Sequence, residues 1–155
     1  MKKSKPVRTK PLELPVDRAP DRQEVTARLK HLIRFGELSL AYQIITSLME
    51  KESDCAELMD LLGTVYLRAG ALDSANGLIR QALHLNPGCV DAHFHLAQVL
   101  AEQGKLLEAL EHAMLAQQSQ PNCSIYQELL AKLESEMEKR VEISGTHRYS
   151  TIVLH

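Results

Sequence analysis

The fold is decided by two consecutive blocks of 34 residues, AELMDLLGTVYLRAGALDSANGLIRQALHLNPGC at 56–89 and VDAHFHLAQVLAEQGKLLEALEHAMLAQQSQPNC at 90–123. Aligned without a gap, the blocks match at a glycine, a leucine, an alanine, a proline and a cysteine, namely Gly70/Gly104, Leu72/Leu106, Ala75/Ala109, Pro87/Pro121 and Cys89/Cys123. Residues 22–55 repeat the period more loosely, with Gly36, Leu38, Ala41 and Cys55. A fixed period of this kind predicts stacked repeat units, each of which buries its apolar face only against its neighbours.

Each unit is expected to contain two helices joined by a short turn. Gly36, Gly70 and Gly104 each follow a helical stretch, where a left-handed glycine ends a helix at little cost. Prolines 87 and 121 end the second helix of their units, because proline disfavours a helical conformation in the residue before it. We therefore predict an all-α fold, a right-handed α-solenoid of helix-turn-helix repeats.

The period and the residues that fill it resemble the tetratricopeptide repeat family. Block 56–89 matches the family pattern at Met59, Leu62-Gly63, Tyr66, Ala75, Ile79, Ala82 and Pro87, and block 90–123 matches it at His93, Leu96-Ala97, Leu100, Ala109, Ala113, Ala116 and Pro121. Block 22–55 is a divergent or capping repeat, because Arg28-Leu29 replaces the Leu-Gly pair. The resemblance implies a module that binds other proteins.

The chain is expected to have three parts. Residues 1–21 form a proline-rich basic arm, whose composition predicts disorder. Residues 22–140 form the repeat domain, which ends in a capping helix at 124–140 with Ile125, Leu129, Leu130 and Leu133 on its apolar side. Residues 141–155 form a tail that includes a β-favouring stretch at 149–154.

Composition and motifs argue against several classes of protein. The 155 residues are 45% hydrophobic with a net charge of −2, and no apolar run approaches the length of a membrane helix or a signal peptide, so we expect a cytoplasmic protein. The sequence contains no nucleotide-binding or hydrolase motif, so we expect no enzyme and no cofactor.

The cysteines and histidines do not predict a metal site. Cysteines one repeat apart are too distant for a disulfide, and no Cys-x-x-Cys or neighbouring histidine completes a zinc set. His93 and His95 point in different directions on a helix, so we expect His93 at the edge of the core and His95 on the surface.

The family resemblance implies that the first helix of each repeat lines a concave groove for a partner. Carried over by register, the groove residues are Lys30, Ile33, Arg34, Asp60, Thr64, Leu67, Arg68, Asp91, Phe94, His95, Gln98 and Glu102. Family members that grip the C-terminal carboxylate of heat-shock chaperones use lysines and asparagines in slots that here hold Asp60, Thr64, Asp91 and His95. An anionic terminus is therefore disfavoured as the ligand.

These residues suggest a polarised groove. Lys30 and Arg34 would make its first part positive, Asp91 and Glu102 would make its last part negative, and apolar anchors would lie between them at Ile33, Leu67 and Phe94. The hypothesis is a partner segment with an apolar centre, acidic towards residues 22–55 and basic towards 90–123. The alternative is that the charges form an ordinary solvated surface.

The most favoured function is a protein-interaction module, such as an adaptor, a scaffold or a small chaperone that holds a peptide or a helical segment of a partner protein. Short three-repeat chains also resemble bacterial secretion chaperones. A second class of function is nucleic-acid or anionic-membrane association through the basic arm.

Overall fold

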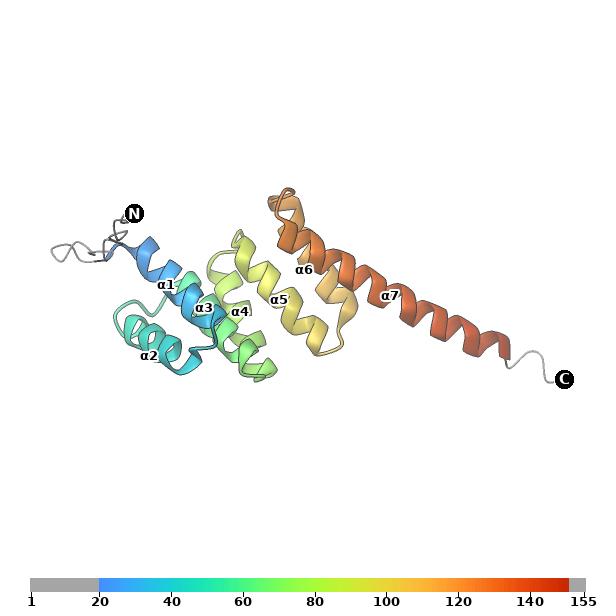
Figure 1. Cartoon of the computed structure of the whole chain (residues 1–155), viewed down its shortest axis with the longest axis horizontal. Helices are drawn as coiled ribbons and strands as arrows, with labels where there is room; N and C mark the ends of the chain where they lie inside the picture. The colour runs from blue at the N-terminus through green and yellow to red at the C-terminus, as the bar shows by residue number, and fades with distance from the viewer. Residues whose placement is uncertain (1–19, 151–155) are drawn as a thin grey trace, which may run out of the picture.

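The computed structural model describes residues 20–150, with side chains described to residue 144. Within this range the chain is entirely helical (Figure 1). The helices are α1 (Arg22–Arg34), α2 (Leu38–Met49), α3 (Ala56–Arg68), α4 (Leu72–Leu85), α5 (Val90–Glu102), α6 (Leu106–Ser119) and α7 (Ser124–Ser150). The predicted all-α fold is confirmed, and the basic arm lies outside the described residues.

The turns inside the three units have the predicted conformation. Gly36, Gly70 and Gly104 have φ values of 84°, 81° and 79°, and each lies between the first and second helix of its unit. The residue after each glycine donates a backbone hydrogen bond into the last turn of the preceding helix, as Glu37 does to the Leu32 carbonyl oxygen at 2.9 Å. This arrangement satisfies carbonyl groups that the end of a helix otherwise leaves unpaired.

The two helices of a unit pack closely where small residues allow it. Ala75 and Ala109 on the second helices are fully buried, as is Ala41 in the first unit. A Cβ atom at Gly63 of α3 would lie only 2.5 Å from Cγ1 of the buried Ile79 on α4. Glycine is therefore required at position 63 for packing, since no left-handed backbone conformation is involved.

The divergence of the first unit has a structural consequence. Leu29 occupies the position equivalent to Gly63 and Ala97, and it is buried against the core that includes Ile45. A leucine fills more space than a glycine, so it holds the facing helices further apart. The pair α1 and α2 accordingly packs less extensively than α3 with α4 or α5 with α6.

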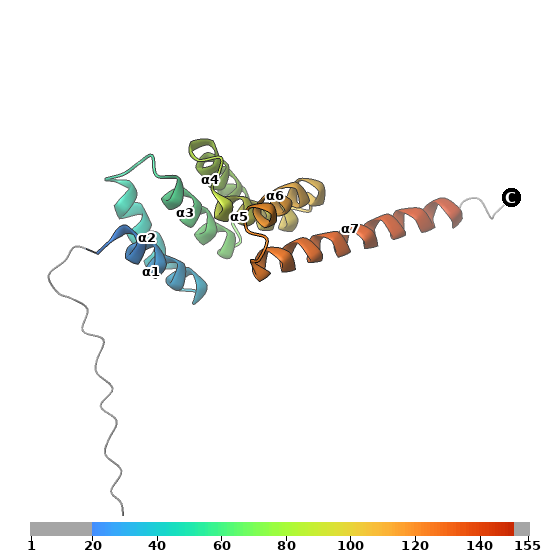
Figure 2. The same cartoon turned by 90° about the horizontal axis from the view of Figure 1, so that it is seen from above.

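The last helix is longer than the sequence predicted. We expected the capping helix to end at residue 140, but α7 continues to Ser150 and projects beyond α6 (Figure 2). The cause is visible in the register, because the position one period after Gly104 is Glu138, and no glycine turn interrupts the helix there. Residues 149 and 150 are helical, while 151–155 lie outside the described residues.

The docking face of α7 also differs from the expected one. Leu133 is 1% exposed, Tyr126 is buried, and Leu129 and Leu130 pack against the core. Ile125, by contrast, is 58% exposed. It occupies the position equivalent to Asp91 of α5, which faces away from the preceding second helix. None of the helices in the described residues could span a membrane.

Gly63 and Gly77, which both lie inside helices, provide a matched test of this packing. Gly63→Ala should destabilise the fold by about 1–3 kcal/mol, because Ile79 must shift. Gly77→Ala on α4 should stabilise it by about 0.5–1 kcal/mol, since a Cβ atom there meets nothing within 4 Å. Urea unfolding measures both values, and two changes of the same sign would contradict the packing argument.

The docking face of α7 can be tested in the same way. Leu133→Ala should lower the free energy of unfolding by about 2–5 kcal/mol, because it opens a cavity between α7 and the body. Ile125→Ala should change it by less than about 0.5 kcal/mol, because that side chain is exposed. Equal losses from the two substitutions would show that α7 docks through a different face.

Candidate protein-binding surface

The sequence-predicted binding residues lie on the face formed by α1, α3, α5 and the first half of α7, which we call the first-helix face. These four helices follow one another at intervals of one repeat, and each contacts the next directly (Figure 1). The second helices α2, α4 and α6 pack behind them. A side chain at a given position of the period therefore recurs on each first helix and forms a row along this face.

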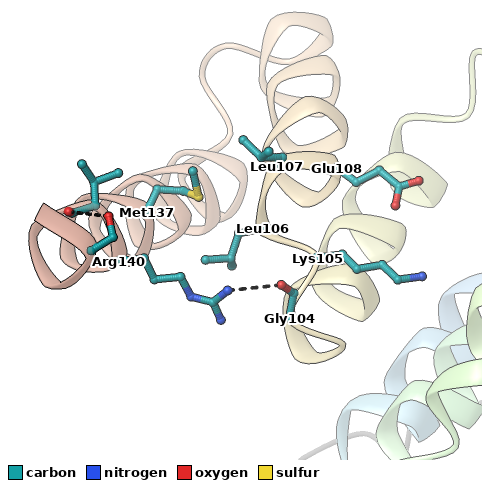
Figure 3. A pocket seen from close by; sticks show the side chains of 9 residues that line it. Gly104, Lys105, Leu106, Leu107, Glu108, Met137 and Arg140 are labelled. Carbon is teal, nitrogen blue, oxygen red and sulfur yellow. Dashed lines mark hydrogen bonds between the residues drawn. The ribbon is translucent and has the colours of Figure 1, made fainter. Parts of the chain in front are cut away.

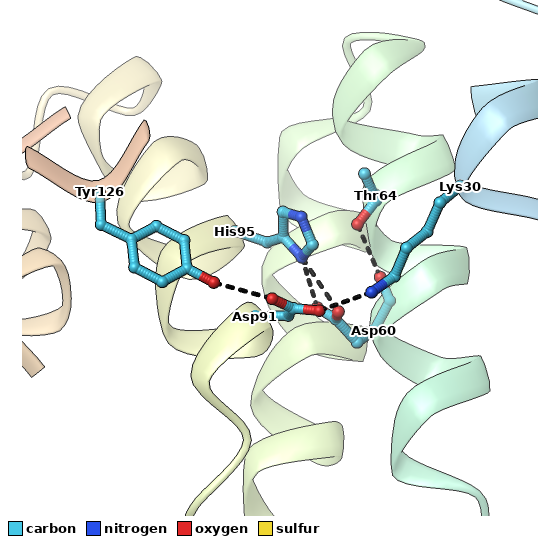
Figure 4. Close-up of polar contacts among 6 residues, drawn as sticks. All are labelled: Lys30, Asp60, Thr64, Asp91, His95 and Tyr126. Carbon is cyan, nitrogen blue, oxygen red and sulfur yellow. Dashed lines mark hydrogen bonds and ion pairs between the residues drawn. The ribbon is translucent and has the colours of Figure 1, made fainter. Parts of the chain in front are cut away.

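A polar network crosses the middle of the first-helix face (Figure 4). Lys30 on α1 reaches over α3 and donates to Oδ2 of Asp91 on α5 at 2.7 Å. Tyr126 on α7 donates to Oδ1 of the same carboxylate at 2.8 Å. Asp91 thus connects the first and the last of the four helices.

The surroundings of Asp91 favour its charged form. Burial alone would raise the pKa of this carboxyl, but the hydrogen bonds from Lys30 and Tyr126 outweigh it and hold the pKa below its usual range. Burial and the adjacent Asp91 carboxylate raise the pKa of the Tyr126 hydroxyl, so the tyrosine remains a donor. Both Lys30 and Asp91 are more than a third exposed, so their ion pair adds at most about 1 kcal/mol to stability.

A second pair lies beneath the first. Asp60 on α3 is 3% exposed, and both of its carboxylate oxygens accept from Nδ1 of His95 on α5 at 3.0 Å. Thr64 donates to the backbone carbonyl oxygen of Asp60 at 2.9 Å. A buried carboxylate needs such a partner, because burying it without one would cost several kcal/mol.

Several expectations about this face are wrong. Ile33 and Leu67 were predicted as apolar anchors, but they are 5% and 8% exposed and belong to the core. His95 was expected on the surface, but its side chain is 16% exposed and bound to Asp60. All three residues lie one helical position away from an outward-facing residue, namely Arg34, Arg68 or Phe94.

The predicted opposition of Lys30 and Asp91 at the two ends of the groove is also wrong. The two side chains form an ion pair with each other, because the lysine is long enough to cross the intervening helix. Neither charge is therefore available alone to orient a partner. The residues still available on the face are Phe94 and Gln98, which are half-buried, and Arg34, Arg68 and Glu102, which are exposed.

Sequence reasoning missed two residues of the face. Tyr126 completes the Asp91 network, and its ring lies 4.9 Å from that of Phe94. Ile125 lies at the equivalent of Asp91 on α7 and is exposed. The repeat spacing could have predicted the Tyr126 contact. Tyr126 follows Asp91 by 35 residues, the same interval by which His95 follows Asp60.

A histidine pair lies on another part of the surface. His93 on α5 and His112 on α6 stack with Nδ1 atoms 2.9 Å apart, and Nε2 of His93 contacts the Pro87 carbonyl oxygen at 2.9 Å. Because that carbonyl oxygen can only accept, His93 carries its proton on Nε2. Nδ1 of His93 then accepts the hydrogen bond that Nδ1 of His112 donates. The pair borders a pocket of about 340 Å³ that Arg80 and His84 also line.

The three cysteines carry no visible chemistry in this structure. All three are free, and Cys55 and Cys89 precede the first residues of α3 and α5. Burial raises the pKa of the Cys89 thiol, which disfavours the reactive thiolate. Among the residues that the structure describes, no three His, Cys, Asp or Glu side chains are grouped so that they could hold a metal ion.

A shallow pocket of about 520 Å³ lies at the end of the solenoid, away from the predicted binding residues (Figure 3). Leu106 and Leu107 of α6 line one side, and Met137 and Val141 of α7 line the other. The guanidinium of Arg140 donates to the Gly104 carbonyl oxygen at 3.4 Å beside it. Because α7 continues without a turn, none of the described residues forms a second helix that covers this area.

Comparison with known proteins agrees with this architecture. Residues 66–133 match the family model described as tetratricopeptide repeat. This part of the chain has the sequence pattern of the tetratricopeptide repeat family. The match extends from the end of α3 to Leu133 on α7, so it includes the turn at Gly104 and the docking of the last helix. No curated protein matches the chain.

Solved tetratricopeptide repeat structures share the fold at low sequence identity. The first repeat domain of human RPAP3 has a TM-score of 0.67 and 17% identity over 76% of this chain and 93% of its own. The Yersinia enterocolitica translocator chaperone SycD has a TM-score of 0.60 and 20% identity over 79% and 85%. The Thermobaculum terrenum O-GlcNAc transferase has a TM-score of 0.66 and 20% identity over 74% of this chain, which spans only 23% of that protein.

The histidine pair predicts a loss of stability in mild acid. Burial lowers the pKa of His112 most, and the neighbouring His93 and Arg80 lower it further. Glu108 and Glu111 raise this pKa, but by less. Its stabilising effect is therefore complete above the ordinary histidine pKa of about 6.5 and is lost as the pH falls below that value. The free energy of unfolding should drop between pH 7.5 and 5.5.

His112→Asn tests this assignment, because asparagine keeps a neutral donor at that position and does not titrate. The drop in stability from pH 7.5 to 5.5, measured by urea unfolding, should be smaller in this variant than in the wild type. An identical pH dependence in both proteins would mean that other groups cause it.

Proposed function

We propose that this protein is a non-catalytic interaction module that holds a peptide or a helical segment of a partner protein on its first-helix face. The observation that carries the proposal is Phe94, a half-buried aromatic side chain beside the polar network. Its ring packs against that of Tyr126 on α7, where the preceding residue, Ile125, is largely exposed. A few well-packed side chains of this kind carry most of the binding energy in protein interfaces.

Proteins of the same fold bind peptides of partner proteins. One solved structure is the first repeat domain of Spaghetti (RPAP3) bound to the HSP90 peptide SRMEEVD, and another is SycD in complex with a peptide of the translocator YopD. Adaptor, scaffold and small-chaperone roles all use such binding. The similarity of length to SycD keeps a secretion-type chaperone among the candidates.

The polar network argues against a ligand that ends in a carboxylate. Asp60 and Asp91 lie at the positions where family members that bind such termini carry cationic or amide groups, and Lys30 is already paired with Asp91. A carboxylate brought to this point would meet two like charges, which cost affinity. We therefore propose an internal segment of a partner as the ligand. The peptide SRMEEVD should bind this chain weakly or not at all.

Binding can be tested without knowledge of the natural partner. A random library of 20-residue peptides is selected on the full chain, and the affinities of the enriched peptides are measured by fluorescence anisotropy. Phe94→Ala should weaken their binding by about 2 kcal/mol, because it removes a buried anchor. Ile125→Ala should weaken it as well, although it leaves stability unchanged.

The control is Leu115→Ala on α6, an exposed leucine on a second helix. It should leave the affinities unchanged. Thermal unfolding of every variant separates a lost contact from a lost fold. If Phe94→Ala and Ile125→Ala bind as the wild type does while Leu115→Ala does not, the first-helix face is not the binding surface.

A further inference from the structure

One row of the first-helix face carries four charged side chains that form no ion pair among the described residues. It consists of Arg34, Arg68, Glu102 and Glu136, which lie at successive intervals of one period on α1, α3, α5 and α7. We call these four residues the charge row. Two positive charges are followed by two negative charges along the solenoid.

The first two members of the charge row lie at adjacent helix ends. Nη2 of Arg68 donates to the backbone carbonyl oxygen of Arg34 at 3.3 Å, which places the Arg68 guanidinium at the end of α1. Glu102 is the last residue of α5, as Arg34 and Arg68 are of α1 and α3. The four helices that carry the row contact one another in the same order.

None of the four charged groups has an ion-pair partner among the described residues, whereas Lys30 and Asp91 in the centre of the face form an ion pair with each other. The charge row therefore offers charges to which a ligand on this face could bind. Its sign changes in the direction that the sequence suggested, and it shares Arg34 and Glu102 with the set of residues on which that suggestion rested.

Helix stability does not explain the row. An arginine at the carboxyl end of a helix is favourable, because it faces the negative end of the helix dipole. Glu102 stands at the same end of α5, where the dipole disfavours a negative charge. The negative charge of Glu102 is therefore unfavourable at the carboxyl end of α5, where the positive charge of an arginine such as Arg68 on α3 would be favourable.

We propose that the charge row selects a partner segment with segregated charges, with acidic residues at one end over Arg34 and Arg68, and basic residues at the other end over Glu102 and Glu136. Phe94 and Ile125 lie about 12 Å and 17 Å from the row along α5 and α7, so a separate, apolar part of the partner contacts them. This inference rests on the proposed function, because it assumes that the first-helix face is the binding surface.

The spacing of the helices sets the length of the segment. Packed helices lie about 8–10 Å apart, so four first helices spread the row over roughly 25–30 Å. An extended segment rises about 3.3 Å per residue and needs about nine residues to cover this distance. A helical segment rises 1.5 Å per residue and needs about 18 residues.

Selective charge reversal provides the test. The random peptide library is selected separately on the wild type, on Arg34→Glu/Arg68→Glu and on Glu102→Lys/Glu136→Lys. The first double variant has a uniformly negative row, and the second has a uniformly positive one. The control Glu50→Lys/Glu111→Lys makes the same change in net charge as the second variant, but on the second-helix side of the molecule.

The wild type and the control should enrich peptides with acidic and basic residues at opposite ends. Arg34→Glu/Arg68→Glu, whose row is uniformly negative, should enrich basic peptides. Glu102→Lys/Glu136→Lys, whose row is uniformly positive, should enrich acidic peptides. Peptides selected on the wild type should lose about tenfold or more in affinity for either row variant, and this loss should shrink at high salt. Thermal unfolding checks that each variant is folded.

The outcomes distinguish this inference from the proposed function. Enriched peptides that depend on Phe94 but show no charge pattern, or the same pattern on all four proteins, would overturn the charge row and leave the binding face intact. Enriched peptides that are indifferent to both Phe94 and the row would overturn both proposals. A failure of the wild type to enrich any peptide would likewise count against both.

Discussion

The close approach of the two helices in the second and third units is the contact around which the rest of the solenoid is arranged. Gly63 leaves room for Ile79, and the equivalent contact in the next unit is made between Ala97 and Ala113, both of them buried. Helices that touch this closely form a compact pair with an apolar face, and only the next pair can cover that face. The order of first and second helices along the solenoid follows from this contact.

This packing separates the molecule into two kinds of surface. The second helices cover the apolar side of the first helices, so the opposite side of each first helix can present outward residues with little structural role. The exception is the network around Asp60 and Asp91, where charge is partly buried and matched by His95, Lys30 and Tyr126. Because this network is satisfied internally, a ligand that must break it loses affinity, whereas a ligand that uses Phe94, Ile125 and the charge row does not.

The period of 34 residues was sufficient to predict the helices, the left-handed glycines and the stacking of units, because these depend on local residues that recur. It was not sufficient to predict the interactions between units. The ion pair of Lys30 with Asp91 spans 61 residues and depends on the reach of one side chain over a helix. Ile33, Leu67 and Ile125 were misplaced because one helical position, about 100°, separates a buried side chain from an exposed one. The extension of α7 was predictable in principle, since Glu138 stands where a turn would need glycine.

The central claim is that ligands bind across the first helices and not on the second ones. Backbone amide chemical shifts of the ¹⁵N-labelled protein, followed while a selected peptide is added, test it most directly. The account predicts that the largest changes follow the outward rows of α1, α3, α5 and the first half of α7, with Phe94, Gln98, Glu102 and Ile125 among them. Changes concentrated on α2, α4 and α6, or in the pocket between α6 and α7, would contradict it.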